Sequence, residues 1–550
     1  MSGRIAPQAI ARHILAAAVL YLLLIQPNHP AAMTWGALRA FPLELPVILS
    51  LLVLTGNGWT GRVLRAVLIT LLMAVALLKL ADFGTFVAFN RGFNLLVDLN
   101  LLHAGWTLAQ GTFGMALAML AGLGALGALV LMAGMLWWAT GVWARHGRPG
   151  WLRVTAAILI LPATVAAVAE VGQARRLWSL PAPVADAIPG AAFTARLALE
   201  RVMQFAETRA ELAAFRTAAR TDPMAGGGPF LDLAGDRDVI LIYVESYGRA
   251  SFDNPLYRPT HSATLRQIGA DLDGRGLAMR SGWAVAPMTG GQSWLAHGTV
   301  ASGLWLDDQG RYRALLASER QTLFHYASAS GRRSVAIMPA HVFPWPEGAY
   351  FGFDAIYNAP DLGYEGQPFN WVTMPDQFTL TALDRLERTR PQGTPGRDPL
   401  LAQVALVSSH APWVPIPPVI DWEAVGDGTV FDPWATSGDP PDVVWRDHDR
   451  VREQYRRAID YSLQTVGSWA ARHADNPPLI IMLGDHQTAG FVSGVTGFDV
   501  PVHIIGPPDL VARFDGPGWQ AGMFPDPAAP ALRMDAMRDV ILRALSSDAP

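Results

Sequence analysis

The first third of the chain constrains its fold most strongly, because it is almost entirely apolar and is interrupted only by short polar stretches. A helix that crosses a membrane needs about 20 apolar residues. Five segments qualify, the second of them short, and we expect residues 1–172 to form a transmembrane domain of about five helices. The segments run from about Ala9 to Ile25, Phe41 to Thr55, Val63 to Leu80, Phe113 to Trp138 and Val154 to Val171.

The first apolar segment has two interpretations. Arg4 and Arg12 precede its apolar core, as they would in a cleaved signal peptide. The residues that follow, Gln26 to Pro30, form a poor cleavage site, and four more segments come after it. We therefore interpret it as a retained membrane anchor.

The distribution of arginine predicts the orientation of the chain, since Lys and Arg concentrate in cytoplasmic segments. With a cytoplasmic N-terminus, seven arginines lie in inside segments and four lie outside. Everything after about residue 172 is then outside the cytoplasm. The inside arginines are Arg4, Arg12, Arg62, Arg65, Arg145, Arg148 and Arg153.

The remainder of the chain divides into a connector and a large domain. Residues 173–236 predict a juxtamembrane amphipathic helix and a Gly-rich linker, because apolar and charged residues interleave up to about Arg220 and glycines follow. Residues 237–550 have the composition of a soluble domain, and their strand signals are continuous apolar runs. Such runs are typical of parallel strands buried on both faces. We expect an α/β domain with a mostly parallel sheet covered by helices.

Composition excludes several classes of function. The absence of cysteine excludes disulfides, thiolate metal sites, a Cys nucleophile and a formylglycine made from cysteine. The net charge of −4 leaves no basic surplus, so we do not expect a nucleic-acid partner.

Polar residues follow four of the predicted strands. Glu245 comes directly after Val239–Val244, the pair Asp485 and His486 follows Leu479–Leu483, and His410 and His341 follow two further strands. Sites in open α/β sheets form beyond the carboxyl ends of strands. Two carboxylates and an imidazole suit Mn²⁺, Zn²⁺ or Mg²⁺. Glu245, Asp485 and His486 are therefore predicted to bind one divalent cation.

A Gly-rich turn offers a candidate nucleophile. In Met288–Trp294, two glycines precede Ser293, and an apolar stretch follows. Glycines let the backbone approach a substrate closely, and the start of a helix attracts an anion. A hydroxyl beside a metal loses its proton more readily and can act as a nucleophile. A simple capping turn remains the alternative explanation of this spacing.

The order of these motifs resembles the alkaline phosphatase and sulfatase superfamily. The motifs are Glu245-Ser, Gly290-Gly-x-Ser, Ser408-Ser-His-x-Pro-Trp and Leu483-Gly-Asp-His. The nearest branch is the lipoteichoic acid synthases, with the phosphoethanolamine transferases next. Members of these branches carry a five-span anchor, a linker helix and an extracytoplasmic catalytic domain.

The resemblance implies roles for individual residues. Glu245, Asp485 and His486 match Mn²⁺ ligands, with Ser293 as nucleophile and fourth ligand. His410 matches a substrate-binding and catalytic histidine. His341 and Trp345 match the region of the family's substrate pocket and are expected to contact substrate. Independently of the resemblance, His297 follows Ser293 by one helical turn, which places it either to orient the site or to contact substrate.

The sequence also departs from the family pattern. The family nucleophile is usually Thr, so Thr289 is the fallback for Ser293. An Arg expected after Trp345 is replaced by Glu347, which argues against polymerisation of glycerol phosphate. Ser293-Trp-Leu-Ala-His also lacks the Pro or Ala and the Arg of a formylglycine motif, so a sulfatase label would describe only the fold.

The sequence thus predicts a metal-dependent transferase in a bacterial inner membrane, with its catalytic domain in the periplasm. Alanine and arginine are abundant and Lys79 is the only lysine, which favours a GC-rich, Gram-negative source. The reaction would move a phosphoglycerol or phosphoethanolamine headgroup from a membrane lipid to a glycan or lipid acceptor through a phospho-Ser intermediate. The alternatives are a phosphodiesterase or phosphatase of the same superfamily, a sulfatase-like protein without formylglycine, and a metal-free binding protein.

Overall fold

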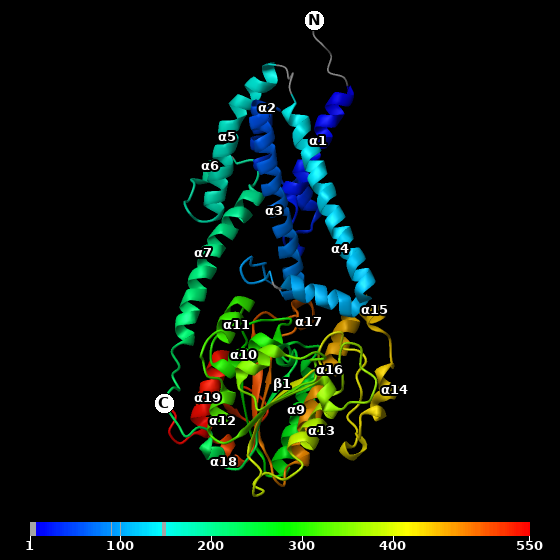
Figure 1. Ribbon diagram of the computed structural model, residues 1–550, viewed down its shortest axis with the longest axis vertical. Helices are drawn as coiled ribbons and strands as arrows, with labels where there is room; N and C mark the ends of the chain where they lie inside the picture. Colours follow the sequence, from blue (N-terminus) through cyan, green and yellow to red (C-terminus); the bar gives the residue numbers. More distant parts are fainter. Residues whose placement is uncertain (1–6, 90, 100, 146–149, 187) are drawn as a thin grey trace. The chain divides into compact units, whose positions relative to one another are not determined.

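The computed structural model describes residues 7–89, 91–99, 101–145, 150–186 and 188–550 (Figure 1). The chain divides into two compact units, Met1–Glu211 and Leu212–Pro550. The connector expected in residues 173–236 is distributed over both units, because helix α7 (Phe193–Ala219) crosses the division.

The first unit is helical, but its number of spans differs from the prediction. Among the described residues, four helical segments are long and apolar enough to cross a membrane, so the predicted count of five is not confirmed. The second predicted span is helix α2, whose 12 residues extend about 18 Å against the roughly 30 Å of a bilayer core. In α4 the apolar span begins at Gly114, where φ is +78°. The helices are α1 (Pro7–Ile25), α2 (Glu44–Thr55), α3 (Trp59–Phe89), α4 (Leu101–Ala144), α5 (Gly150–Ala174) and α6 (Ala182–Asp186), with 3-10 turns η1 (Pro30–Ala32) and η2 (Trp35–Arg39).

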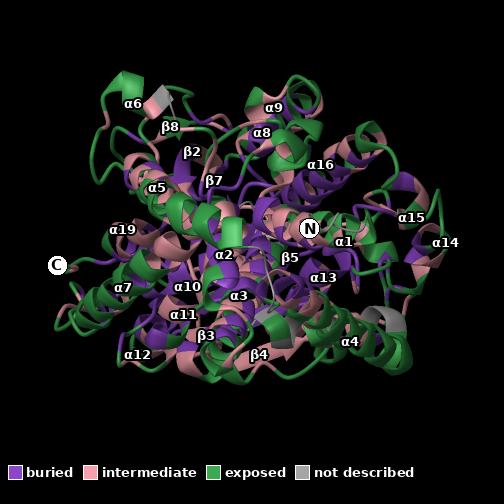
Figure 2. Ribbon diagram, turned by 90° about the horizontal axis from the view of Figure 1, so that it is seen from above, coloured by how far each residue is buried: buried purple, intermediate pink, exposed green. Residues whose placement is uncertain are grey.

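The outer surface of this unit is apolar, which fits a lipid environment. Leu117, Leu120 and Leu123 on α4 are each more than half exposed (Figure 2). A contiguous apolar surface of this kind is rare on soluble monomers, whereas in a bilayer it contacts acyl chains. The composition and the exposed surface therefore agree that these helices contact lipid.

The ends of the helices fix the direction of the chain through the first unit. The end of α1, at Ile25, lines the same cavity as the end of α5, at Ala174. Near the start of α1, the ring of His13 packs against Trp143, at the end of α4. The residues that follow α5 therefore leave the helices at the end opposite to the start of α1, whether or not α2 spans. Two of the arginines that predict orientation, Arg4 and Arg148, lie outside the described residues.

The start of α7 packs on the first unit instead of forming a free connector. Arg196 pairs with Glu170 on α5, and Arg201 pairs with Asp82 on α3. Both carboxylates are buried. These ion pairs explain why the first compact unit extends to Glu211.

The second unit contains a mixed sheet of nine strands, in the order β4-β3-β5-β1-β6-β7-β2-β8, with β9 beside β2. Neighbouring strands from β4 to β6 are parallel, and β7 runs antiparallel to both β6 and β2. The predicted strands Val239–Val244 and Leu479–Leu483 are present as β1 and β6. The strands are β1 (Val239–Val244), β2 (Ala278–Val285), β3 (Arg333–Met338), β4 (Ala355–Asn358), β5 (Leu400–Leu406), β6 (Leu479–Gly484), β7 (Asp499–Gly506), β8 (Gln520–Ala521) and β9 (Leu532–Arg533).

Helices cover both faces of this sheet, as a parallel arrangement requires. Alternate residues of β1 enter two different cores: Ile242 packs with α9, α13 and α16, and Tyr243 packs with α10, α12 and α19. The expected α/β domain with helices on both faces is confirmed. The helices are α8 (Ala250–Asp253), α9 (Arg258–Gly274), α10 (Ser293–Ser302), α11 (Gln309–Leu316), α12 (Leu323–Ala329), α13 (Asp376–Glu387), α14 (Asp432–Ala435), α15 (Pro441–Val444), α16 (His448–Arg472), α17 (Gly490–Ser493), α18 (Pro508–Val511) and α19 (Met537–Leu545).

Short 3-10 turns connect several of these elements. They are η3 (Asp232–Ala234), η4 (Pro346–Phe351), η5 (Ala359–Leu362), η6 (Trp422–Ala424), η7 (Thr429–Phe431) and η8 (Met534–Ala536).

The arrangement of the strands places the site. Strands β3, β5, β1 and β6 are consecutive neighbours in the sheet and run parallel. Their carboxyl ends therefore lie at one edge. The loops after these four strands carry His341, His410, Glu245 and the pair Asp485–His486.

Candidate metal centre and nucleophile

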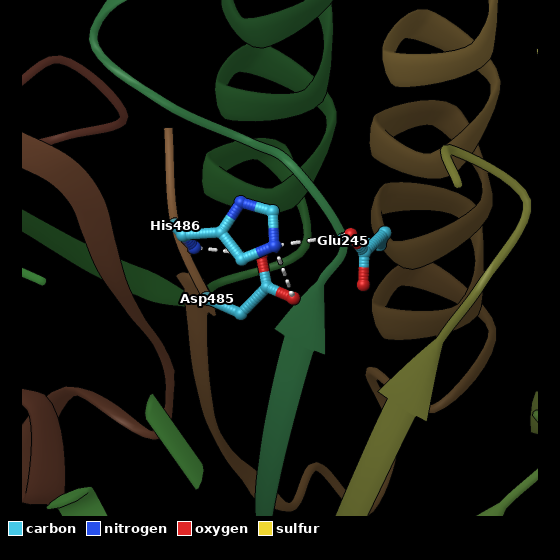
Figure 3. A group of neighbouring side chains, drawn as sticks. All are labelled: Glu245, Asp485 and His486. Atoms are coloured by element: carbon cyan, nitrogen blue, oxygen red, sulfur yellow. Dashed lines mark hydrogen bonds and ion pairs between the residues drawn. The ribbon is translucent and has the colours of Figure 1, made fainter. Parts of the chain in front are cut away.

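Three buried side chains form a group able to hold a metal ion. One ligand atom each from Glu245, Asp485 and His486 lies within 4.8 Å of the others (Figure 3). His486 Nε2 is 3.2 Å from Glu245 Oε1 and 3.8 Å from Asp485 Oδ2. Among the described residues, no other group of three such ligands was found.

Backbone groups hold the Asp485 and His486 side chains with their free atoms toward the centre of this group. Asp485 Oδ1 accepts hydrogen bonds from the amides of Ser246 and His486, at 2.8 and 2.7 Å. His486 Nδ1 donates to the Gln487 carbonyl at 3.0 Å. This bond fixes the tautomer in which Nε2 offers its lone pair to a metal.

Ser293 reaches the same group of side chains from helix α10. It is the first residue of α10, and its Oγ donates to Glu245 Oε2 at 2.9 Å. The same Oγ lies 3.3 Å from His486 Nε2. The first amides of a helix lack intrahelical partners and attract anions. The Ser293 hydroxyl and the start of α10 therefore lie beside the predicted metal ligands.

The backbone on both sides of the site adopts unusual conformations. Ser246 has φ of 61° and Gln292 has φ of 66°, in the left-handed region that non-Gly residues rarely occupy. Ser246 follows the ligand Glu245, and Gln292 precedes Ser293. A Cβ on Gly484, which precedes Asp485, would lie 1.8 Å from the Tyr247 carbonyl oxygen. Glycine is therefore required for β6 to approach the loop after β1 so closely.

The charges of the group are strongly coupled. Burial and the negative charge of Glu245 raise the pKa of Asp485 to about 8. Burial alone would raise the pKa of Glu245, but the charge of His486 and its hydrogen bond hold that pKa well below its usual range. Burial opposes the charging of His486, yet the two carboxylates raise its pKa to about 9. Two buried carboxylates this close repel each other and are stabilised by positive charge.

The donor set fits a divalent cation. Two carboxylates, one imidazole with a fixed tautomer and one hydroxyl supply oxygen and nitrogen ligands, which suit Mn²⁺, Zn²⁺ or Mg²⁺. Two buried carboxylates converge here beside His486, and this convergence is the strongest structural argument for a bound cation.

A cavity of about 230 Å³ opens beside the ligands. Its lining includes the predicted nucleophile Ser293 together with the predicted substrate residues His297, His341, Trp345 and His410. His341 and Trp345 meet edge to face, with ring centroids 5.3 Å apart. The structure thus brings together every site residue predicted from the sequence except Thr289.

Thr289 lies apart from this cavity. It forms an isolated bridge with Gln487, and the amide of Gly290 donates to the Gln487 carbonyl at 2.8 Å. Thr289 is not among the residues that line the cavity. Its position makes it a support for the turn that carries Ser293.

His410 is exposed at the cavity and has one nitrogen available. Its Nδ1 donates to the Ala411 carbonyl at 2.6 Å, so neutral His410 presents an unprotonated Nε2. An imidazole in this state accepts a proton, and after doing so it can donate one.

Among the lining residues that the sequence did not predict, two polar ones lie inside strands. Tyr243 and Gln403 lie inside strands β1 and β5 and line the cavity. Tyr243 Oη and His297 Nε2 are buried without a hydrogen-bond partner, and the two rings are in contact at an interplanar angle of 39° with centroids 4.0 Å apart. Gln403 was a detectable signal, because a buried amide is unusual in an apolar strand. Tyr243 had none, since aromatic residues are common in strands.

A second acidic cluster in the sequence has a structural role. Asp447 caps α16 by accepting hydrogen bonds from the amides of Asp449 and Arg450. Asp449 is exposed and pairs with Arg452 at 2.9 Å.

His503, in β7, is a buried histidine with two hydrogen-bond partners. Its Nε2 lies 3.1 Å from the Tyr247 hydroxyl, and its Nδ1 lies 2.7 Å from the Ser281 hydroxyl.

Comparisons with known proteins find similar solved structures but no family. No family model matches the chain, and no curated protein matches it. The lipoteichoic acid synthase LtaP from Listeria monocytogenes is 15% identical with a TM-score of 0.33, and the match covers 50% of this chain and 65% of that one. The phosphoglycerol transferase GacH from Streptococcus pyogenes is 12% identical with a TM-score of 0.35, covering 55% and 75%.

A protein in the alkaline phosphatase superfamily from Vibrio parahaemolyticus is 16% identical with a TM-score of 0.36, covering 62% of this chain and 75% of that one. One of these proteins is a lipoteichoic acid synthase and another is in the alkaline phosphatase superfamily, and these are the two groups that the sequence motifs resemble. With TM-scores below 0.5, the roles of individual residues rest on the geometry of the site.

Proposed function

We propose that this protein is a metal-dependent phosphotransferase that takes a phospho-headgroup from a membrane lipid and passes it to a hydroxyl of a glycan or another lipid. The observation that carries the proposal is the position of Ser293. Its hydroxyl lies at the start of a helix, 2.9 Å from Glu245 and 3.3 Å from His486, beside an open cavity.

Glu245, Asp485, His486 and Ser293 would hold one divalent cation, with Mn²⁺ favoured by the family resemblance. When bound, the cation would lower the pKa of the hydroxyl and offset the negative charge of the substrate phosphate. Asp485 and His486 stay oriented for this role by their bonds to backbone amides and to the Gln487 carbonyl.

Ser293 would enter and leave the reaction as the alkoxide, having released its hydroxyl proton to solvent on binding of the cation. In the first half of the reaction, Ser293 Oγ attacks the phosphorus of the lipid phosphodiester. The bond from phosphorus to the diacylglycerol oxygen breaks, and the headgroup phosphate remains on Ser293 as a phosphodiester. Protonated His410 donates a proton to the leaving oxygen. In the second half, neutral His410 Nε2 accepts the proton of the acceptor hydroxyl, whose oxygen attacks the phosphorus and releases Ser293.

The charge of the cavity favours a diester over a monoester as donor. A phosphodiester carries one negative charge, whereas a monoester carries nearly two at neutral pH. The described lining contains no Lys or Arg, and the described residues offer a single cation site. One cation and a helix end suffice for a diester, which is the linkage of a phospholipid headgroup.

The proposal is tested by product analysis of the full-length, Mn²⁺-loaded protein with phosphatidylglycerol or phosphatidylethanolamine vesicles. We expect release of diacylglycerol, and transfer of the headgroup phosphate to an added glycan or glycolipid acceptor. Release of the free headgroup phosphate with or without acceptor would make the protein a hydrolase. Failure to release diacylglycerol from either lipid would contradict both activities.

The topology of the chain gives a further prediction. If the arginine bias gives a cytoplasmic N-terminus, the residues after α5 enter the periplasm, because α1 and α5 end at the same end of the first unit. There, lipid headgroups share the plane of the anchor, and ATP is not available as donor. An alkaline phosphatase reporter fused after Pro550 should be active, and a fluorescent reporter that matures only in the cytoplasm should be dark.

A matched fusion controls this measurement. The same reporters placed after Gly58, between α2 and α3, should give the opposite pattern, because that turn lies near the arginine-rich end. A dark phosphatase fusion and a bright fluorescent fusion after Pro550 would invert the topology and remove the argument for an outer-leaflet donor.

A further inference from the structure

A second cavity lies within the first unit, formed by the end of α1 and its following loop, α3, the end of α5 and the start of α7. We call it the bundle cavity, and its volume is about 410 Å³. Ligand-binding cavities in proteins range from about 300 to 1,000 Å³. Its polar lining residues are Gln26, Asn28, Lys79, Arg175, Arg196 and Glu200.

The charges that face the bundle cavity are mainly positive. Lys79, Arg175 and Arg196 line it against a single acid, Glu200, which pairs with Arg175. Two nearby acids do not line it. Glu44 accepts a hydrogen bond from the Ala195 amide, and Glu170 accepts from the Ala192 amide and Arg196. Three cationic side chains and one acidic side chain therefore face the cavity, while Glu170 pairs with Arg196 and the charge of Glu44 acts on Lys79 from outside the lining.

Lys79 is the most informative of these residues. It is only 3% exposed, and its Nζ donates to the Leu24 carbonyl at 2.7 Å and to the Thr194 hydroxyl at 3.1 Å. Within the described part of the chain, no ion pair joins it to a carboxylate. Both hydrogen-bond partners of this buried ammonium are neutral, and the charge of Glu44 acts on it without a direct ion pair. Burial of a cation in a membrane-spanning helix is costly, and a bound anion would lower that cost further.

An apolar groove continues from the bundle cavity. A neighbouring cavity of about 590 Å³ shares Ile25, Gln26, Ala32 and Ala37 with it. The remaining lining is largely apolar and includes Leu22, Met33, Trp35 and Leu38. Trp35 is 88% exposed, as expected for an aromatic residue at a membrane interface.

We propose that the bundle cavity binds the phosphate of a membrane phospholipid and that the adjoining groove holds the start of its acyl chains. A cavity lined by one ammonium and two guanidinium groups, joined to an apolar groove on helices with a lipid-exposed surface, matches the two halves of such a molecule. This site is separate from the group around Ser293 and does not depend on the proposed reaction.

Native mass spectrometry of the full-length protein in detergent tests the proposal by counting bound lipids. The probes are phosphatidylglycerol, phosphatidylethanolamine, diacylglycerol with the same acyl chains, and glycerol phosphate. We expect at least one of the two phospholipids to bind about tenfold more tightly than diacylglycerol or glycerol phosphate, because only a phospholipid supplies both parts. If both phospholipids bind, the cavity recognises the phosphate group that they share. If only phosphatidylglycerol binds, the cavity recognises the net negative charge of the lipid. Equal binding of diacylglycerol would overturn the proposal, as would equal binding of glycerol phosphate.

Two adjacent arginines supply the matched variants. Arg175 lines the cavity, whereas Arg176 is exposed and does not. Arg175→Gln should remove one bound phospholipid, with about tenfold weaker binding, and Arg176→Gln should change binding less than twofold. Arg175→Gln alone leaves Glu200 without its ion-pair partner. The double variant Arg175→Gln/Glu200→Gln removes both charges of the pair and should lose the lipid as well.

The acyl groove has its own test. Ala37 lines both cavities, and Ala37→Trp should fill the junction and displace the phospholipid without changing any charge. If Arg175→Gln does not fold, this variant decides the question. Equal loss from Arg175→Gln and Arg176→Gln, or undiminished binding to Ala37→Trp, would show that lipid associates with the surface and not with the bundle cavity.

Discussion

Ser293→Ala is expected to abolish turnover, with a loss of about four orders of magnitude or more, while the fold stays intact. The substitution removes the only hydroxyl that contacts both Glu245 and His486 among the described residues. Ser293 is partly exposed, so the lost hydrogen bond should cost about 1 kcal/mol of stability. Transfer rates and thermal unfolding of the full-length variant measure both effects.

Thr289→Ala is the matched control for this prediction. Thr289 lies four residues earlier in the same Gly-rich turn but does not line the cavity, so its variant should keep activity within several-fold of wild type. A variant at Ser293 with near-normal activity, together with an inactive variant at Thr289, would move the nucleophile to Thr289.

Removal of the divalent cation is expected to abolish activity and to lower the melting temperature by several degrees. Burial, and after it the charge of Glu245, raise the pKa of Asp485, so the charged form of this carboxylate is disfavoured until a cation binds beside it. A ligand present at 100 times its dissociation constant stabilises the folded state by about 2.7 kcal/mol. EDTA treatment followed by addition of Mn²⁺, monitored by thermal unfolding and activity, should show the loss and its recovery.

Elemental analysis of variants locates the cation. Asp485→Asn should lose the stoichiometric metal. Asp449→Asn should keep the stoichiometric metal. Asp449 belongs to the segment Asp447-His-Asp449, outside the ligand group, and pairs with Arg452 at the surface. A wild-type protein without stoichiometric metal, whose activity is indifferent to EDTA, would contradict the metal site.

The ligand group could be predicted from the sequence because its members follow parallel strands. Continuous apolar runs mark β1 and β6, which are neighbours in the sheet, so Glu245 and Asp485 had to emerge at the same edge. No such rule applied to Ser293. It follows β2, which carries Arg280 and Ser281 and therefore gives no continuous apolar signal. Its approach to Glu245 depends on long-range pairing of β2 with β7.

The first unit was harder to predict than the sheet. Hydropathy identified the apolar segments and marked the second, Phe41 to Thr55, as short. The helix α2 covers only Glu44–Thr55 of it, starting after Pro42. Hydropathy could not show that Lys79 and Arg175, nearly 100 residues apart, line one cavity. The periodicity of apolar residues predicts which face of a helix is apolar. It does not predict which helices pack against each other, because those contacts join residues far apart in the sequence.

The central claim is that Ser293 carries the headgroup phosphate between donor and acceptor. The most direct measurement is mass spectrometry of the full-length, Mn²⁺-loaded protein, quenched in acid shortly after mixing with phosphatidylglycerol or phosphatidylethanolamine in the absence of acceptor. We expect a mass increase equal to the headgroup phosphate, located by fragmentation on Ser293, absent from Ser293→Ala and lost on addition of acceptor. Turnover of lipid without any modification of Ser293, or with the phosphate on another residue, would contradict the account.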